Sequence, residues 1–261
     1  MSAAILSKTC PAALITGAAQ RIGKAIALDL ASHGWAIAVH YRRSKAEAEE
    51  LVKEIAARGG KAAAVACDLA REAEVQTLVP RAVAALGQPL TCLVNNASNF
   101  EMDKIDTATR ESWDRHIETN LRAPLVLSQA FARQLPEGSE GNIVNLLDQR
   151  VWKLTPYFLS YTVAKSGLWT LTRTLALALA PHIRVNGIGP GPTLPSERQS
   201  AEQFRQQQLA VPLKHGATPE EIAATVRFIL ATPSMTGQMI ALDGGEHLGW
   251  AQSSRGFVAS E

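Results

Sequence analysis

Several features that would assign the chain to a common class of protein are missing from the sequence. Among its 261 residues, 26 Lys and Arg nearly balance 24 Asp and Glu, and no basic block occurs. We therefore expect neither nucleic acid nor an anionic membrane surface as a partner. The longest apolar stretch, residues 166–180, is interrupted by Arg173 and is too short to span a bilayer. Only Lys8 precedes the first short apolar run, unlike in a signal peptide, so we expect a soluble cytoplasmic protein.

Cysteine and phenylalanine are also scarce. Cys10, Cys67 and Cys92 are odd in number and lack the spacing of a metal or redox site, so no metal is expected. Each lies in or beside an apolar run, which predicts reduced side chains used for packing. The chain has six phenylalanines, and Phe100 follows a predicted strand, where open α/β sheets bind ligands. Packing of the loop is the alternative role for this ring.

Short apolar runs alternate with helical patterns along the whole chain. This order predicts one α/β domain over residues 1–261, with a core at about 12–247 and loose ends. Its sheet is expected to be Rossmann-type, doubly wound and parallel, with about seven strands and helices on both faces. The predicted strands are 12–16, 35–41, 61–68, 91–94, 141–147, 182–188 and 237–242. The predicted helices are 22–32, 45–58, 71–86, 109–135, 156–180 and one that begins at Thr218.

The first predicted strand runs into the segment TGAAQRIG and then into a helix. Gly17 and Gly23 would let the backbone approach a phosphate at the helix N-terminus, where N–H groups and the helix dipole favour an anion. Ordinary strand-to-helix turns also need glycine, so this pair alone is weak. Arg21 lies between them, and a cation is unfavourable at a helix N-terminus. A nearby anion or a substrate contact would explain Arg21 better than a solvated position does.

The second predicted strand ends in HYRRS and carries no acidic residue. An Asp or Glu there would bind the ribose 2′-hydroxyl of NAD, whereas arginine favours the 2′-phosphate of NADP. Arg43 and Ser44 are therefore candidate ligands of a 2′-phosphate. Ser44 and Glu47 have the spacing of a capping box, so a helix N-cap is an equally good role for Ser44.

Tyr161 and Lys165 stand four residues apart in a helical pattern. This spacing would put both side chains on one face, where the ammonium would favour the phenolate form of the tyrosine. A surface pair on an amphipathic helix is the alternative. Asp148 ends the fifth predicted strand, thirteen residues before Tyr161. A carboxyl there could relay a proton to a ring nitrogen if burial kept it partly protonated, which Lys165 would oppose. The charge state of Asp148 is left open.

Five motifs, in order, resemble the short-chain dehydrogenase/reductase family: TGAAQRIG, HYRRS, NNASNF, Asp148 with YxxxK, and GPG. The resemblance covers about residues 12–247. Four departures from the commoner pattern resemble the pteridine reductase branch, which includes dihydromonapterin reductases; they are Arg21, Arg43–Ser44, Ser98–Phe100 and Asp148. The resemblance implies strand order 3-2-1-4-5-6-7, a homotetramer, NADPH as cofactor and a pterin C=N bond as hydride acceptor. Dihydropterin, dihydromonapterin and dihydrofolate are equally open as substrates.

The same resemblance implies roles for individual residues. Catalysis is expected from Asp148, Tyr161, Lys165 and Asn120, the last holding a water in a proton path to the lysine. Cofactor contacts are expected from Gly17, Arg21, Ile22, Gly23, Tyr41, Arg43, Ser44, Asp68, Leu69, Asn96, Ala97, Tyr161, Lys165, Pro190 and Gly191. Substrate contacts are expected from Arg21, Ser98, Phe100, Asp148 and Tyr161, with the pterin between the nicotinamide and Phe100. An N-cap for Asp68 and a polar helix position for Asn120 are the alternatives.

Residues 193–208, after the GPG motif, are expected to be irregular and mobile and to form a substrate lid.

Three other functions are alternatives to pterin reduction. A reductase of ketones, such as a 3-oxoacyl thioester, would use the same Tyr–Lys pair but commonly has serine in place of Asp148. An enoyl reductase of this fold would have tyrosine at position 158, which is Phe. A redox sensor that binds NADP without turnover would not need Tyr161, Lys165 and Asn120.

Overall fold

A single seven-stranded parallel sheet forms the centre of the molecule. The structure, a computed structural model, describes residues 10–196 and 199–249; the predicted loose ends lie outside these residues. The strands are β1 (Ala12–Ile15), β2 (Ala36–Tyr41), β3 (Ala62–Ala66), β4 (Cys92–Asn95), β5 (Gly141–Leu146), β6 (Ile183–Pro190) and β7 (Met239–Leu242). Their order is β3-β2-β1-β4-β5-β6-β7, and all pairs are parallel, as predicted.

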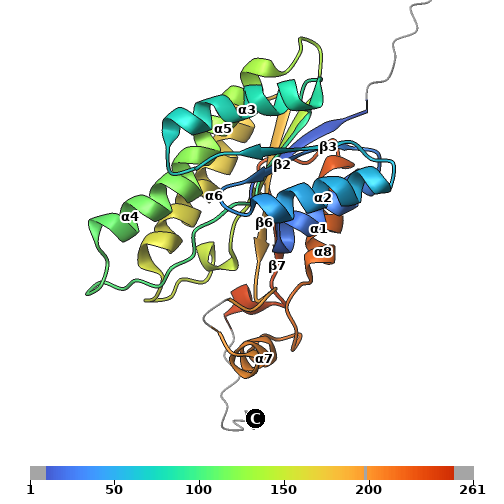
Figure 1. The fold of residues 1–261 in the computed structure, drawn as a ribbon. Coiled ribbons are helices and arrows are strands. Elements are labelled where there is room, and N and C mark those ends of the chain that lie inside the picture. Colours follow the sequence, from blue (N-terminus) through green and yellow to red (C-terminus); the bar gives the residue numbers. More distant parts are fainter. Residues whose placement is uncertain (1–9, 197–198, 250–261) are drawn as a thin grey trace, which may run out of the picture.

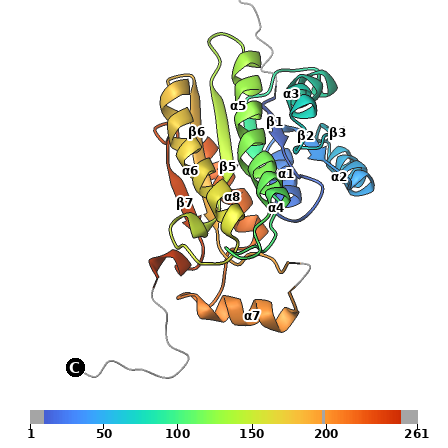
Figure 2. The same ribbon diagram turned by 90° about the vertical axis from the view of Figure 1, so that its left-hand side faces the viewer.

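Helices cover both faces of this sheet. They are α1 (Arg21–Ser32), α2 (Lys45–Ala57), α3 (Glu72–Leu86), α4 (Arg110–Ile117), α5 (Ala123–Gln134), α6 (Leu159–Leu179), α7 (Ala201–Ala210) and α8 (Pro219–Leu230). Helices α1, α2 and α8 lie on one face, and α3, α5 and α6 on the other (Figures 1 and 2). Among the described residues, none of the helices combines the length and apolarity needed to cross a membrane.

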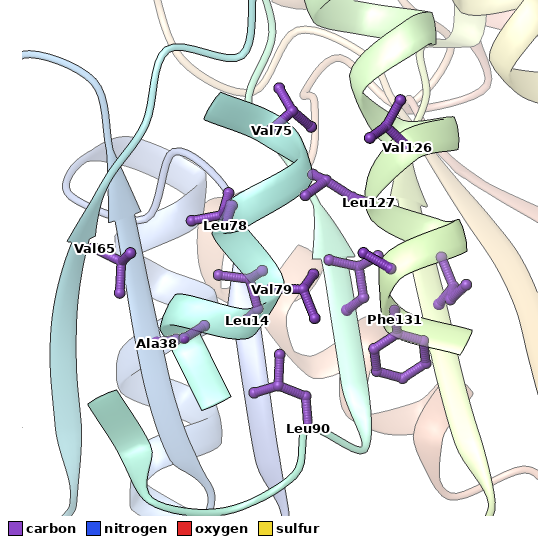
Figure 3. Close-up of a cluster of buried hydrophobic side chains, with 14 of the residues drawn as sticks. Leu14, Ala38, Val65, Val75, Leu78, Val79, Leu90, Val126, Leu127 and Phe131 are labelled. Atoms are coloured by element: carbon purple, nitrogen blue, oxygen red, sulfur yellow. The ribbon is translucent and has the colours of Figure 1, made fainter. Parts of the chain in front are cut away.

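The strands are apolar because each central strand is covered on both sides. All residues of β1 and β4 are buried, as expected for a parallel sheet between two helical layers. On one face, Leu14 packs with Leu78 of α3 and Phe131 of α5 (Figure 3). On the other face, Ile26 of α1 belongs to a second buried cluster that includes side chains of α2 and α8. These two clusters pack the sheet between its two layers of helices.

The helical pattern predicted over 109–135 is interrupted in the structure. Between α4 and α5 lies one π-helical turn, η1 (Glu118–Arg122), in which the Ala123 N–H bonds the Glu118 carbonyl. Pro124 has no N–H to donate to the carbonyl of Asn120, four residues earlier, which weakens the regular ladder at this point. The widened turn places Asn120 in the buried interior, with 1% of it exposed.

Three local expectations are wrong. The polar run expected to be irregular contains α7, which begins with a capping box between Ser200 and Gln203; residues 197–198 of the predicted lid lie outside the described residues. The helix expected from Pro156 begins at Leu159. Cys67 and Cys92 are buried as predicted, but Cys10 is exposed, because it precedes the first strand instead of packing within it.

Candidate active site

Two adjoining clefts open at the carboxyl ends of the strands. The first, of about 500 Å³, is lined by the turn after β1 and by the ends of β2, β3 and β4. The second, of about 590 Å³, is lined by the ends of β5 and β6 and by the start of α6. Arg21, Ile22, Asn96 and Ser98 line both, so the two form one long groove. The groove crosses the point where the strand order reverses beside β1, the common ligand site of such sheets.

The groove brings together almost every residue predicted from the sequence. The first cleft is lined by Gly17, Arg21, Ile22, Gly23, Tyr41, Arg43, Ser44, Asp68, Leu69, Asn96 and Ala97. The second is lined by Ser98, Phe100, Asp148, Tyr161, Lys165, Pro190 and Gly191. Asn120 is the exception. Its amide accepts from the Asn99 N–H and donates to the Asn99 carbonyl, both at 2.8 Å. It therefore braces the loop after β4, and its role in a proton path stays a prediction.

The turn after β1 needs both of its glycines. Gly17 has a φ of +63°, and a side chain at Gly23 would lie 2.2 Å from the Gly17 carbonyl oxygen. Asn96 braces this turn by donating to the carbonyls of Thr16 (2.8 Å) and Gly17 (3.2 Å). The first residues of helix α1 therefore line the first cleft, where the N–H groups of the helix N-terminus favour an anion.

His40, at the end of β2, also supports the turn. Its Nδ1 accepts from the Gly17 N–H at 2.9 Å, so the neutral ring carries its proton on Nε2 and donates to the Cys67 carbonyl at 3.0 Å. Burial lowers the pKa of His40 from 6.5 to about 4. Nothing in the sequence identifies His40 as a functional residue, because a histidine within an apolar strand gives no local sign of its partners.

Acid is expected to destabilise the fold through His40. The unfolded chain takes up a proton on this residue below pH 6.5, whereas the folded protein does so only near pH 4, so stability falls as the pH drops through this window. The loss is at most about 3 kcal/mol. Urea unfolding at pH 6.5 and pH 4 should show a shallower pH dependence for His40→Gln than for the wild type. Equal pH dependence of the two proteins would contradict this origin.

Arg21 has a left-handed backbone and a contact that the sequence did not predict. Its φ is +55°, at the position where the family pattern has glycine. Its guanidinium donates to the carbonyls of Pro195 (2.9 Å) and Leu194 (3.4 Å). Arg21 therefore ties the turn after β1 to the segment that follows β6, and its charge lies at the junction of the two clefts.

Arg43 and Ser44, the candidate ligands of a 2′-phosphate, follow the end of β2 and line the first cleft. Ser44 is the N-cap residue of α2, but its side chain makes no capping hydrogen bond. Glu47, its expected partner in a capping box, accepts instead from the Gln20 side chain at 3.0 Å. The Ser44 hydroxyl and the exposed Arg43 both line the first cleft. The N-cap position expected for Ser44 is therefore confirmed, but the capping box with Glu47 does not form. The N-cap alternative for Asp68 is wrong, because the N-cap position of α3 is held by Arg71, and the Asp68 side chain accepts from the Ala70 N–H at 3.1 Å.

Replacement of Arg43 by alanine is expected to weaken NADPH binding by about 10- to 100-fold, the usual value of a charged hydrogen bond. NADH binding should hardly change, because NADH has no 2′-phosphate. Titration of cofactor fluorescence measures both dissociation constants. Lys45→Ala is the matched control, since Lys45 begins the same helix but pairs with Glu49 at 3.6 Å. Unchanged NADPH binding in Arg43→Ala would contradict the assignment.

Asp148, Tyr161 and Lys165 meet in the second cleft. The Tyr161 hydroxyl donates to Asp148 Oδ2 at 2.8 Å, and Lys165 Nζ donates to the Leu146 carbonyl at 2.6 Å. Lys165 Nζ lies 5.8 Å from the centre of the Tyr161 ring, on the same face of α6, as the four-residue spacing predicted. Tyr161 and Lys165 are 5% and 2% exposed, so the surface alternative is wrong.

The pKa values of this pair differ from the sequence expectation. Burial, followed by the charge of Asp148 and its hydrogen bond, raises the pKa of Tyr161 well above 10. Burial also lowers the pKa of Lys165 to about 8, against the opposing pull of Asp148. Burial and Asp148 thus outweigh any effect of Lys165 on the phenol, and the expectation that Lys165 favours the phenolate stays a prediction. The phenol therefore keeps its proton at neutral pH and donates it in a hydrogen bond to Asp148.

Two residues of this cleft were missed by the sequence analysis. Phe158 stacks on Phe100 with ring centres 4.4 Å apart and an angle of 8°. The Arg150 guanidinium lies 5.5 Å and 5.0 Å from the centres of these two rings and 3.4 Å from Asp148 Oδ2. Phe158 reaches this position through a left-handed backbone, with φ at +59°, which no sequence rule assigns to phenylalanine.

Phe100 lies at the wall of the groove rather than in the core. It is 39% exposed, and its ring meets that of Tyr161 edge to face at 4.8 Å. One side of the ring is covered by Phe158. The aromatic wall and the Asp148–Tyr161 pair thus face a common space, which can receive a flat polar ring on one side and proton transfer on the other.

Comparison with known proteins finds similar reductases. Residues 17–247 match a family model described as enoyl-(acyl carrier protein) reductase. A crystal structure of FolM alternative dihydrofolate reductase 1 from Brucella suis in complex with NADP is 50% identical, with 94% of this chain and 98% of that chain covered and a TM-score of 0.90. A 3-oxoacyl-[acyl-carrier-protein] reductase from Synechocystis is 33% identical over 243 residues, covering 91% of this chain and 97% of the relative.

Proposed function

Because the chain belongs to the short-chain dehydrogenase/reductase family, we propose that it reduces a C=N bond of a pterin with NADPH. The observation that carries this proposal is the hydrogen bond from Tyr161 to the carboxylate of Asp148. Reduction of a ketone and reduction of a C=N bond both consume a proton as well as a hydride. A serine in place of Asp148 could steady a ketone oxygen but would not readily supply a proton, whereas a carboxyl group joined to the phenol can relay one to a ring nitrogen.

The residues of the first cleft fit a bound NADPH. Gly17 and Gly23 allow a phosphate to approach the start of α1. Arg43 and Ser44 would hold the 2′-phosphate, and Asp68 and Leu69 would flank the adenine. When bound, NADPH supplies the hydride. The cited relative from Brucella suis, crystallised with NADP, supports this choice of cofactor.

The residues of the second cleft would position the substrate and transfer the proton. Phe100, backed by Phe158 and Arg150, would stack against the substrate ring and align it. Tyr161 would give its proton to the ring nitrogen, and Asp148 would return a proton to the phenol oxygen from solvent. Lys165 would orient the nicotinamide ribose and stabilise the oxygen of Tyr161 while it lacks its proton. The carboxylate that raises the pKa of Tyr161 is thus also its source of replacement protons.

Two related activities fit this cleft less well. A 3-oxoacyl thioester reductase, the activity named for the Synechocystis relative, commonly has serine in place of Asp148. Phe158 occupies the position where an enoyl reductase would have a tyrosine, and its ring is stacked on Phe100. Within the pterin class, dihydropterin, dihydromonapterin and dihydrofolate all present a flat bicyclic ring to the same wall.

Transfer of deuterium tests the proposed reaction. The enzyme is incubated with NADPH deuterated at the reactive position of the nicotinamide C4, together with a 7,8-dihydropterin, and the product is analysed by NMR. We expect deuterium on the pterin carbon next to the newly protonated nitrogen. Absence of deuterium from every pterin, with deuterium at C3 of an acetoacetyl thioester offered in its place, would contradict the proposal.

A homotetramer remains our expectation for the assembly. Helix α6 presents Val163 and Leu177, which are 43% and 84% exposed, on its outer side. In this family the helix with the Tyr–Lys pair packs against its partner in the dimer. Light scattering on a size-exclusion column should give four times the chain mass of 28.0 kDa. The mass of a single chain would contradict the expectation.

A further inference from the structure

A buried network joins the loop that carries Phe100 to the helix that carries Tyr161. It consists of Asp103 from the loop after β4, His116 from α4 and Ser160 from α6. Their exposed fractions are 2%, 0% and 0%. Among the described residues, neither cleft is lined by any of these three side chains, so they cannot touch a ligand there. Buried polar side chains are normally hydrogen-bonded, so three of them from separate elements are expected to be partners of one another.

The chemistry of the donors fixes the direction of each hydrogen bond. The Glu101 main-chain N–H can only donate, and it lies 3.1 Å from His116 Nε2. His116 is therefore neutral, with its proton on Nδ1, and this N–H donates to Ser160 Oγ at 2.7 Å. The Ser160 hydroxyl then donates to Asp103 Oδ2. One continuous line of hydrogen bonds thus runs from the main chain beside Phe100 to a carboxylate.

Asp103 fixes the first turn of α6. Its Oδ1 accepts from the Ser160 main-chain N–H at 3.1 Å, and its main-chain carbonyl accepts from the Leu159 N–H at 3.3 Å. Burial opposes its ionisation, but hydrogen bonds from Ser160 and Ser112 outweigh this and hold the pKa of Asp103 below its usual value. A carboxylate at a helix N-terminus is also favoured by the helix dipole.

We propose that Asp103, His116 and Ser160 are positioning residues that hold Phe100 and Tyr161 in register. Phe100 immediately precedes Glu101, and Tyr161 immediately follows Ser160, so the network fixes the peptide beside each ring. The two rings meet edge to face at 4.8 Å, and the His116 ring lies 5.9 Å from that of Tyr161. The same network thereby aligns the Phe100 ring, which would stack on the substrate, with the Tyr161 hydroxyl, which would protonate it.

The network also has a defined response to acid. The groups that face His116 are Asp103, Glu101, Arg115, Ser160 and Tyr161. A protonated His116 would present an N–H to the Glu101 N–H, and that hydrogen bond would be lost. Since burial lowers the pKa of His116, the neutral form is kept at neutral pH. Loss of the bond would free the peptide next to Phe100.

The test is a double-mutant cycle between Ser160→Ala and Phe100→Ala. Steady-state kcat and KM are measured with a 7,8-dihydropterin and with an acetoacetyl thioester, alongside the NADPH dissociation constant and the melting temperature. Ser128→Ala is the control, because Ser128 is a buried serine on α5 whose hydroxyl, among the described residues, donates to the Pro124 carbonyl of its own helix at 2.6 Å. His116→Gln is the second variant and serves if Ser160→Ala does not fold.

We expect Ser160→Ala to lower kcat/KM for the dihydropterin at least about tenfold, whereas Ser128→Ala and NADPH binding stay within about twofold of the wild type. In a protein that already carries Phe100→Ala, adding Ser160→Ala should lower kcat/KM much less than it does in the wild type, since the two residues act through the same arrangement. Equal losses in both backgrounds, or a lower melting temperature with unchanged kcat, would overturn the proposal.

The inference rests on the proposed function only in taking a pterin as the ligand of Phe100. If the wild type reduces the thioester and no pterin, the proposed function fails. The positioning of Tyr161 is then read from the thioester alone. A loss of kcat of about tenfold in Ser160→Ala but not in Ser128→Ala would support it, and equal kcat in both would overturn it.

Discussion

Tyr161→Phe is expected to lower kcat for dihydropterin reduction by about 100- to 10,000-fold, the usual contribution of a positioned general acid. The substitution keeps the ring and its edge-to-face contact with Phe100 and removes only the hydroxyl that donates to Asp148. NADPH binding should change by no more than about twofold, because Tyr161 is not among the residues that line the first cleft. Stopped-flow absorbance at the NADPH band measures the rate.

A matched control is available four residues earlier in the chain. Tyr157 is 48% exposed, and its ring packs against Lys104 rather than against the cleft. Tyr157→Phe should therefore leave kcat within about twofold of the wild type. A decrease of less than tenfold for Tyr161→Phe would show that the proton comes from another group.

Asp148→Asn is expected to give the second large effect, again about 100- to 10,000-fold in kcat/KM for the pterin. Asparagine has the same shape but one acceptor oxygen, so it can keep either the hydrogen bond from Tyr161 to Oδ2 or that from the Arg150 main-chain N–H to Oδ1 at 2.8 Å, not both. It can no longer carry a proton. Removal of the carboxylate charge should also lower the pKa of Tyr161, since that charge is the second cause that raises it. NADPH binding should be much less affected.

Asp148→Ser separates a chemical from a structural role of this residue. Serine matches the residue common in ketone reductases, so pterin reduction should fall far more than NADPH binding. The measurements are kcat/KM for a dihydropterin and the NADPH dissociation constant, with the melting temperature as a check on folding. Equal losses in both would mean that Asp148 holds the strand end of β5 in place and does no chemistry.

Most of the framework could be predicted because it depends on local signals. Continuous apolar runs between helical patterns predicted the strands, whereas their order, which the structure confirms, was implied by the resemblance to the family. The interruption at Asn120 was foreseeable only in part, since Pro124 lacks an N–H but the widened turn depends on packing. Helix α7 was not predicted because the prolines before it break regular structure, whereas the helix begins only after them, at the capping box of Ser200.

The site was predicted by residue but not by electrostatics. Spacing placed Tyr161 and Lys165 on one face of a helix, yet their pKa values follow burial and the approach of Asp148, which are tertiary facts. Arg150 and Phe158 were missed for a similar reason. Their roles arise where the segment after β5 folds back on the loop carrying Phe100, and neither has a local pattern that identifies it.

The most direct measurement is the ratio of kcat/KM for a panel of dihydropterins and dihydrofolate to that for an acetoacetyl thioester, all with NADPH. A carboxylate joined to the phenol, beneath a stacked aromatic wall, predicts that at least one pterin is turned over and is preferred to the thioester. Good turnover of the thioester with no turnover of any pterin would contradict it.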